Sequence, residues 1–161
     1  MKGCSRRWWL RLAVAGLLTP GALVLGSVPA EAAPVGPETV LAGGTSQGLP
    51  SFFKISANGQ TVKIGAIALE MSCASGASFT APDTVGRIRI GPKGNIRSNV
   101  NIPPTALSSG GTYSGSDAMT AFVGPRRSRI AGVWQLRLSY SFPDGTTDQC
   151  YSGPVRFVDS Q

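Results

Sequence analysis

Two short serine motifs match patterns that hydrolases use for nucleophilic catalysis. Gly44–Gly48 reads Gly-Thr-Ser-Gln-Gly, the G-x-S-x-G pattern in which a strand-to-helix turn exposes a serine to a histidine base. Ser51 and Lys54 have the S-x-x-K spacing, which brings the two side chains together only on a helix. Residues 51–57 alternate between apolar and polar types as a strand does. We therefore expect the first motif to be a turn or strand entry and the second to be structural.

The chain contains no histidine at all. Without an imidazole it cannot use a Ser-His or Cys-His nucleophile, a histidine general base, a histidine-containing zinc site or a histidine pH switch. No phosphate-cradling glycine loop or calcium-binding loop is present in the sequence. The sequence therefore predicts no metal and no cofactor.

Chemistry based on a pair of carboxylates needs no histidine, as in glycoside hydrolysis. Most acidic residues outside the N-terminal segment lie in stretches with turn composition, where Asp is expected for local hydrogen bonding. Glu70 is the exception, since it is predicted in mid-strand and facing solvent. A single sequence does not show which acids meet across a fold, so a small carbohydrate-active hydrolase remains an alternative. The candidates are Glu38, Glu70, Asp83, Asp117, Asp144 and Asp148.

The densest positive cluster consists of Arg126, Arg127 and Arg129, beside a Gly-Pro turn. Guanidinium groups suit the geometry of phosphate and carboxylate groups. The cluster is therefore a candidate site for an anionic cell-wall polymer or glycan, and a solvated loop is the alternative interpretation.

Cys73 and Cys150 are the two cysteines that follow the N-terminal segment. In an exported protein such an even pair is most simply a structural disulfide. It would close a loop of roughly 77 residues, for which the chain-entropy model gives on the order of 4 kcal/mol.

The first 32 residues have the composition of an export signal. Four basic residues accompany the start of an apolar stretch at 10–25, and Ala30-Glu31-Ala32 offers a cleavage site between small residues. The Arg6-Arg7 pair resembles the twin-arginine motif, and a general secretion signal is the alternative. The apolar stretch is short for a membrane span. We expect a secreted or envelope-associated monomer with no membrane span after processing.

Removing this leader changes the charge of the chain. It takes away four of the 15 basic residues and one of the 8 acidic residues, so the net charge falls from +7 to +4. That mild excess is compatible with attraction to anionic polymers, but it is not the composition of a nucleic-acid-binding protein.

After the leader, apolar and polar residues alternate in short runs separated by turn signals. Asn58-Gly59 predicts a tight hairpin turn between strands at 51–57 and 61–73, with a bulge or bend near Gly65. The run at 130–142 is the most regular of all. These patterns are typical of an antiparallel β protein.

Two segments, 74–83 and 103–115, lack this alternation and are predicted to be loops. A rigid loop such as 103–115 could occupy a protease, so protease inhibition is a second alternative function. Seven to nine short strands without an amphipathic helix predict an all-β antiparallel β-sandwich, immunoglobulin-like or jelly-roll-like, with its topology open. We expect one such domain over 44–161, after a flexible lead-in at 33–43 that leads into a first strand around 38–42.

Several short motifs resemble those of small exported bacterial β-domain proteins with no assigned activity. They are Gly44–Gly48, Cys73, the Gly-x-Trp-x-Leu-Arg run at 132–137, and the Cys-x-Ser-Gly-x-Val-x-Phe run at 150–157. The resemblance implies an all-β fold stapled by a disulfide, and it transfers no catalytic or binding residue. Together with the leader, it predicts an exported, non-catalytic binding or interaction module at the cell envelope or outside the cell.

Overall fold

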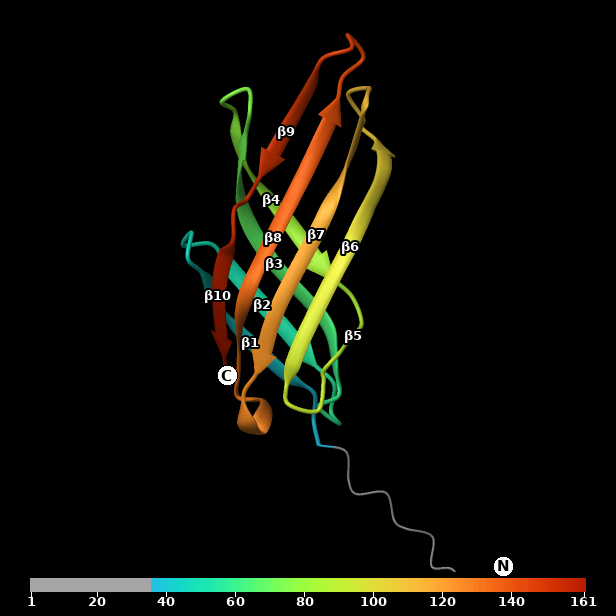
Figure 1. The fold of residues 1–161 in the computed structure, drawn as a ribbon. Helices are drawn as coiled ribbons and strands as arrows, with labels where there is room; N and C mark the ends of the chain where they lie inside the picture. Colours follow the sequence, from blue (N-terminus) through green and yellow to red (C-terminus); the bar gives the residue numbers. More distant parts are fainter. Residues whose placement is uncertain (1–35) are drawn as a thin grey trace, which may run out of the picture. The chain divides into compact units, whose positions relative to one another are not determined.

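The computed structural model describes residues 36–161, so the predicted leader at 1–32 lies outside the described residues. The described part is all-β, as predicted, with a single short 3-10 helix, η1 (Figure 1). Among these residues no helix has the length and apolar character needed to cross a membrane. The elements are β1 Thr39–Thr45, β2 Pro50–Ile55, β3 Thr61–Cys73, β4 Ser78–Val85, β5 Ile88–Arg89, β6 Asn95–Ala106, β7 Thr112–Val123, η1 Pro125–Arg127, β8 Arg129–Ser141, β9 Thr147–Tyr151 and β10 Val155–Ser160.

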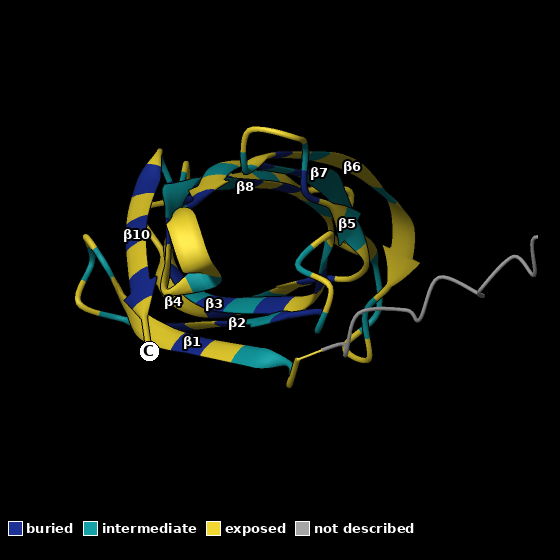
Figure 2. Cartoon of the chain, turned by 90° about the horizontal axis from the view of Figure 1, so that it is seen from below, coloured by how far each residue is buried: buried dark blue, intermediate teal, exposed yellow. Residues whose placement is uncertain are grey.

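The strands form one sheet that closes on itself. Strands β9 and β10 both pair with the same edge of β8, one after the other along its length. The opposite edge of β10 pairs with β1, and the opposite edge of β9 pairs with β3. The path β8-β10-β1-β2-β3-β9 therefore returns to β8 as a six-strand barrel. Strands β7 and β6 extend from β8, and β4 and β5 pair with β3. Figure 2 shows β10 joining the two opposed layers at one side.

The predicted sandwich is thus corrected to a barrel with additional strands. A sandwich keeps its two sheets separate, whereas the C-terminal stretch of this chain pairs with both halves. The chain changes course at 152–154 between β9 and β10, where Gly153 has a φ of +68°. At this break the Ser152 hydroxyl accepts a hydrogen bond from the Leu136 N–H at 3.0 Å.

The predicted disulfide is present and lies at the closure of the barrel. Cys73 on β3 and Cys150 on β9 are directly opposite each other, with their Cα atoms 3.9 Å apart. Strands β3 and β9 share only two paired positions, Ser72 with Tyr151 and the cysteines themselves. The covalent bond therefore reinforces the shortest pairing in the ring.

The hairpin predicted at Asn58-Gly59 joins β2 and β3, and Gly59 takes the positive φ of +70° that the turn requires. The register shifts opposite Lys54 and Ile55, so the strand changes phase before Gly65. As a result Val62 is buried, and Ile64, expected on the same face, is 38% exposed.

Both segments predicted as loops are largely strands. Strand β4 begins at Ser78, and β6 and β7 leave only 107–111 between them. The pairing of β6 with β7 is irregular between Ile102 and Thr105, where two prolines interrupt the alternation. The long loop proposed for a protease inhibitor is therefore absent from 103–115. The first strand predicted around 38–42 is present as β1, which begins at Thr39 and continues to Thr45.

The barrel interior is filled by aromatic and branched aliphatic side chains. Trp134, Phe53 and Phe157 are essentially fully buried, and the rings of Phe53 and Phe157 stack with centroids 4.9 Å apart. Trp134 contacts both of these rings. This apolar core fixes the position of the Trp134 indole, whose N–H points to the polar site described next.

Candidate functional site

The inner surface of the sheet is open to solvent between β4 and β6. Within the described residues, β4 pairs only with β3 and β6 pairs only with β7, so no strand fills the space between their facing edges. A depression of about 340 Å³ lies there. We call it the acid cleft, lined by Asp83 and Val85 of β4, Arg87 and Ile88 that follow, Ser98, Val100 and Ile102 of β6, and Asp117 of β7.

Strand alternation places two carboxyl groups on the inner face. On β4, Asp83 lies between the buried residues Ala81 and Val85 in the same phase. On β7, Asp117 is in phase with the buried Met119. Since successive side chains of a strand point to opposite faces, both acids must point inward if their apolar neighbours do.

The two carboxyl groups meet beside the Trp134 indole. The indole Nε1–H donates to Asp83 Oδ2 at 3.0 Å, and the Thr84 backbone N–H donates to Asp83 Oδ1 at 2.8 Å. Asp117 lies close enough to Asp83 for the negative charge of Asp83 to act on it. Two neighbouring carboxyl groups repel each other when both are ionised, which favours a proton on one of them.

Asp117 is the more deeply buried member, with 4% of its surface exposed. Its Oδ1 atom has no N–H or O–H partner among the described residues. Burial, and secondarily the negative charge of Asp83, raise the pKa of Asp117 to about 7. Burial also raises the pKa of Asp83. Asp117 therefore keeps its proton below about pH 7 and loses it above that pH.

A second depression of about 310 Å³ adjoins the acid cleft and shares the lining residues Asp83 and Ile102 with it. We call it the aromatic cleft; its walls include Phe79, Tyr113 and Tyr140. The ring centroid of Tyr140 lies 6.3 Å from that of Phe79 and 6.1 Å from that of Tyr113. Burial raises the pKa of the Tyr140 phenol, so this ring stays neutral near pH 7.

The four other candidate acids do not join this pair. Glu38 forms ion pairs with Lys54 and Lys63, which lower its pKa. Asp144 accepts hydrogen bonds from Thr146, and Asp148 accepts them from Ser75, so both act within or between turns. Glu70 is exposed, as predicted.

Asp83 and Asp117 are both among the candidates that the sequence offers, but no local pattern brings them together. A signal exists for Asp117, because it is separated from Met119, Ala121 and Val123 by steps of two residues and so shares their face of a strand. The segment 74–83, which ends at Asp83, is composed mainly of Ser, Ala, Gly and Pro, and this composition predicts a loop. Nothing in the local pattern indicated that β4 and β7 face each other.

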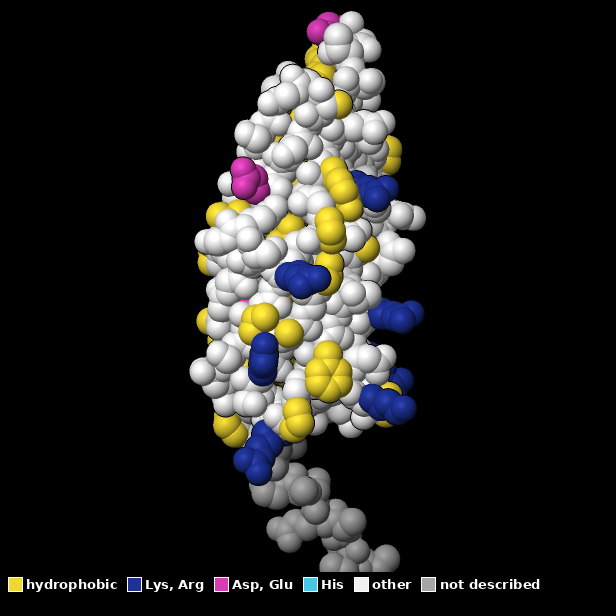
Figure 3. Space-filling model, turned by 60° about the vertical axis from the view of Figure 1, so that its left-hand side comes forward, with side chains coloured by type: hydrophobic (Ala, Val, Ile, Leu, Met, Phe, Trp, Pro, Cys, Tyr) yellow, Lys and Arg dark blue, Asp and Glu magenta, His cyan; other side chains and the backbone are white. Residues whose placement is uncertain are grey.

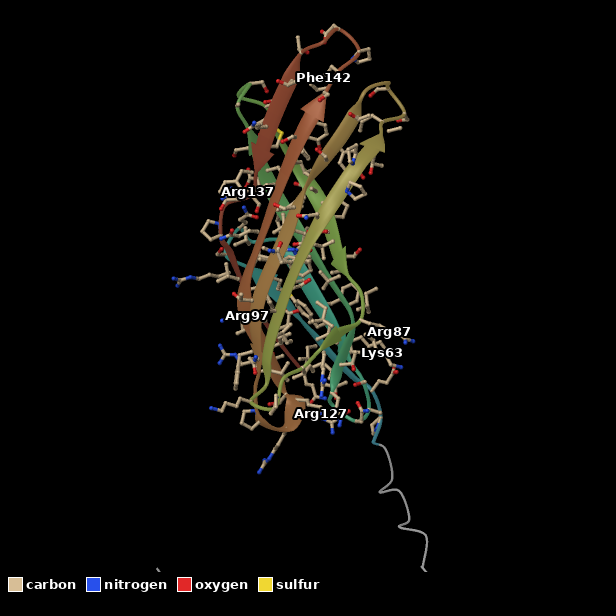
Figure 4. All side chains as sticks on the ribbon, turned by 45° about the vertical axis from the view of Figure 1, so that its right-hand side comes forward. Lys63, Arg87, Arg97, Arg127, Arg137 and Phe142 are labelled. Carbon is tan, nitrogen blue, oxygen red and sulfur yellow. A yellow bond between two sulfur atoms is a disulfide. The ribbon has the colours of Figure 1, made fainter. Side chains whose placement is uncertain are left out.

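The arginine cluster lies at the end of the barrel opposite Phe142 (Figure 4). The Arg127 guanidinium donates to the backbone carbonyls of Ser56 and Ala57, so this residue holds the β2–β3 turn. Arg126 and Arg129 are exposed, and Arg126 and Arg127 line a depression of about 530 Å³ together with Lys93. Binding of an anionic ligand by this cluster stays a prediction. On the face drawn in Figure 3, Lys and Arg side chains mostly stand apart from one another.

The serine motifs and the cysteines have structural roles. The Ser46 hydroxyl accepts a hydrogen bond from the Arg156 N–H at the turn after β1. The buried Ser51 donates to Asp159, whereas Lys54 pairs with Glu38, so the S-x-x-K residues point to opposite faces as predicted. Asp148 lies near Cys73 and Cys150, but their sulfur atoms are bonded to each other and supply no thiolate for a metal.

The acid cleft is thus where the two inward-facing carboxyl groups, Asp83 and Asp117, line a depression that opens to solvent. Comparison with protein-family models, with curated proteins and with solved structures finds no match for this chain.

Proposed function

We propose that this chain is an exported, non-catalytic binding protein whose ligand site is the acid cleft. The observation that carries the proposal is the carboxyl group of Asp117, which is buried, has an oxygen without a protein donor, and lines a depression that opens to solvent. A buried acceptor without a partner costs about 1–3 kcal/mol. A ligand that donates a hydrogen bond to it would recover that free energy on binding.

The shape of the site also supports ligand binding. Small-molecule sites are concave and mostly apolar, with a few polar groups that orient the ligand. Here the apolar walls come from Val85, Ile88, Val100 and Ile102, and the polar groups are the two acids together with Thr84, Arg87 and Ser98. Val100 is 48% exposed although it faces inward, because no strand covers this side of the sheet.

The acids of the cleft do converge, which is the condition for the alternative of a carboxylate-pair hydrolase. Glycoside hydrolases separate their two carboxyl groups by about 5–5.5 Å or about 6.5–9.5 Å, so that the scissile bond and a water fit between them. Both oxygens of Asp83 accept hydrogen bonds from Trp134 and Thr84, and Asp117 is 4% exposed, so neither carboxyl group stands open beside a scissile bond. This arrangement therefore favours binding over hydrolysis.

Export and envelope association are part of the same proposal. They are supported by the leader predicted at 1–32 and by the Cys73–Cys150 disulfide, which is typical of oxidising compartments. The resemblance to small exported bacterial β-domain proteins agrees with this assignment. The ligand would then be a molecule that the protein meets at or beyond the envelope.

The test is to block the acid cleft with a large side chain. V100W fills the cleft, and V158W is the matched control, since Val158 is a similarly exposed strand valine (45%, against 48% for Val100) outside the cleft. Both variants and the wild type would be titrated by calorimetry with soluble peptidoglycan fragments, neutral oligosaccharides, and phenylalkyl amines and alcohols. We expect the probes that bind wild type and V158W to lose affinity for V100W. Equal binding to V100W, or no binding by any probe, would overturn the proposal.

A further inference from the structure

We propose that the ligand of the acid cleft is an organic cation, a protonated amine whose ammonium group lies between Asp83 and Asp117 and whose apolar body lies in the aromatic cleft. This inference rests on the proposed function and specifies the chemical class of the ligand. It follows from the charge and hydrogen-bonding capacity of the two acids in the acid cleft, from the rings of the aromatic cleft, and from the lining residues that the two depressions share.

The acid end lacks a positive partner. The salt bridges among the described residues all involve Glu38, so neither Asp83 nor Asp117 is ion-paired. The other charged residue that lines the acid cleft is Arg87, which extends outward from the connection after β4 (Figure 4). Buried carboxylates are normally paired with a cation or hydrogen-bonded donors. The missing partner is therefore a positive group that enters from outside.

An ammonium group matches this pair better than a hydroxyl group does. It carries three N–H donors and a full positive charge, so it can donate to both carboxyl groups at once. A hydroxyl group has one donor, which satisfies one oxygen and leaves the negative charges uncompensated. Charge-assisted hydrogen bonds are also roughly twice as strong as neutral ones.

The aromatic cleft suits the remainder of such a ligand. Phe79, Tyr113 and Tyr140 line it, and Asp83 and Ile102 belong to both depressions, so one molecule can reach from the acids to the rings. Phe79 is 37% exposed, which leaves a ring surface available for contact. Aromatic rings attract cations through their negative faces and also bury apolar groups. A ring-bearing or aliphatic amine uses both properties.

Below about pH 7, binding of the ammonium group should release the proton that Asp117 holds. In that range the free site holds one proton and one net negative charge; the ammonium cation enters, the proton leaves to solvent, and the net charge of the site is unchanged. The titratable or charged groups that line the two depressions are Asp83, Asp117, Arg87 and the tyrosines 113 and 140. Because Asp117 has a pKa of about 7, proton competition should weaken amine binding below that pH.

The probes are phenylalkylamines with two, three or four methylene groups and the alcohols of the same length. Their ammonium groups titrate near the range of lysine, about 10, and so stay charged at pH 8. We expect at least one amine to bind more tightly than its alcohol, and about tenfold more tightly at pH 8 than at pH 6. Calorimetry in two buffers of different ionisation enthalpy should show release of close to one proton at pH 6.

Two variants assign the effect to the pair. D117N should weaken amine binding at pH 8 at least tenfold and remove its pH dependence. The matched control D159N alters another buried acid, which lies on β10 opposite Gly43, and should leave amine binding unchanged. Urea unfolding of both variants would establish that they are folded under the conditions of the titration.

The outcomes separate this inference from the proposed function. Alcohols or oligosaccharides that bind as well as the amines, and that V100W rejects, would overturn the cationic ligand and leave the cleft as a binding site. Failure of all three amines to bind would also overturn it. Amine binding that V100W and D117N retain would place the amine elsewhere and overturn this inference. If V100W also retains every other bound probe, the proposed function fails as well.

Discussion

Replacing Asp117 by asparagine should make the protein more stable at high pH. Asparagine keeps the shape of the side chain, carries no negative charge, and can donate a hydrogen bond from its amide to Asp83. It therefore resembles the protonated form of Asp117 at every pH. The variant isolates the cost of ionising an acid that is 4% exposed and lies next to another acid.

The sign of the effect follows from the direction of the pKa change. Burial raises the pKa of Asp117 from 3.8 to about 7. Between these two values the native protein keeps a proton that the unfolded chain releases, so the free energy of unfolding falls as pH rises. The loss is nearly complete about one unit above the folded pKa, near pH 8. Each unit of pKa corresponds to about 1.36 kcal/mol, so wild type should lose up to roughly 3 kcal/mol between pH 5 and pH 8 through this group.

Urea unfolding at pH 5, 6, 7 and 8 measures this difference. We expect D117N to gain on the order of 2 kcal/mol relative to wild type between pH 5 and pH 8, after allowing for water that reaches the cleft. D144N is the control, because hydrogen bonds from Thr146 lower the pKa of this exposed acid. Its contribution changes only in acid, so its curve should parallel that of wild type from pH 5 to 8. Parallel curves for D117N and wild type would refute the assignment of a raised pKa to Asp117.

Two further predictions concern the ends of the barrel. Removing the disulfide with C73A/C150A should lower the free energy of unfolding by on the order of 4 kcal/mol. Reduced wild type should show the same thermal unfolding as the variant. An unchanged Tm would contradict a role of the disulfide in barrel closure. R127A should lose about 1–2 kcal/mol in urea unfolding, because its guanidinium donates to two turn carbonyls. R126G should be neutral or stabilising, since Arg126 has a φ of +60°, and equal effects of the two substitutions would argue against the hydrogen bonds to the turn.

The features that were predictable from the sequence are those that local patterns determine. The strand predicted at 130–142 alternates strictly from Trp134 onward and appears as β8, Arg129–Ser141. Asn58-Gly59 supplies the conformation of a hairpin turn, and the turn is where it was expected. The two cysteines outside the leader leave one possible pairing, and they form it.

Closure of the barrel was not predictable in the same way. It depends on β9 and β10, which contact β8 on one side and two much earlier strands on the other. Such pairings join residues far apart in sequence. The alternation of apolar and polar residues indicates which face of a strand is buried, but not which strand lies beside it. The break at 152–154 was visible as a change of phase, but which strands lie on either side of it was not.

The acid pair was hidden for a related reason. Asp83 and Asp117 lie on β4 and β7, which do not pair with each other, so no turn or register connects them. They meet because both strands border the open part of the sheet and both acids occupy inward positions. The prolines and small polar residues around these strands interrupt the alternation that would have marked them.

The other buried acid of the barrel shows why the acid pair points to function. Asp159 also has an oxygen without a partner among the described residues, and burial also raises its pKa. Yet it accepts a hydrogen bond from the Ser51 hydroxyl at 2.5 Å and lies opposite Gly43, in the closed part of the sheet. Asp117 has an acid as its neighbour, which adds electrostatic repulsion to the cost of burial. Apolar side chains at these two positions would stabilise the barrel more than two neighbouring acids do. The acid pair is therefore better explained by binding of a ligand in the acid cleft.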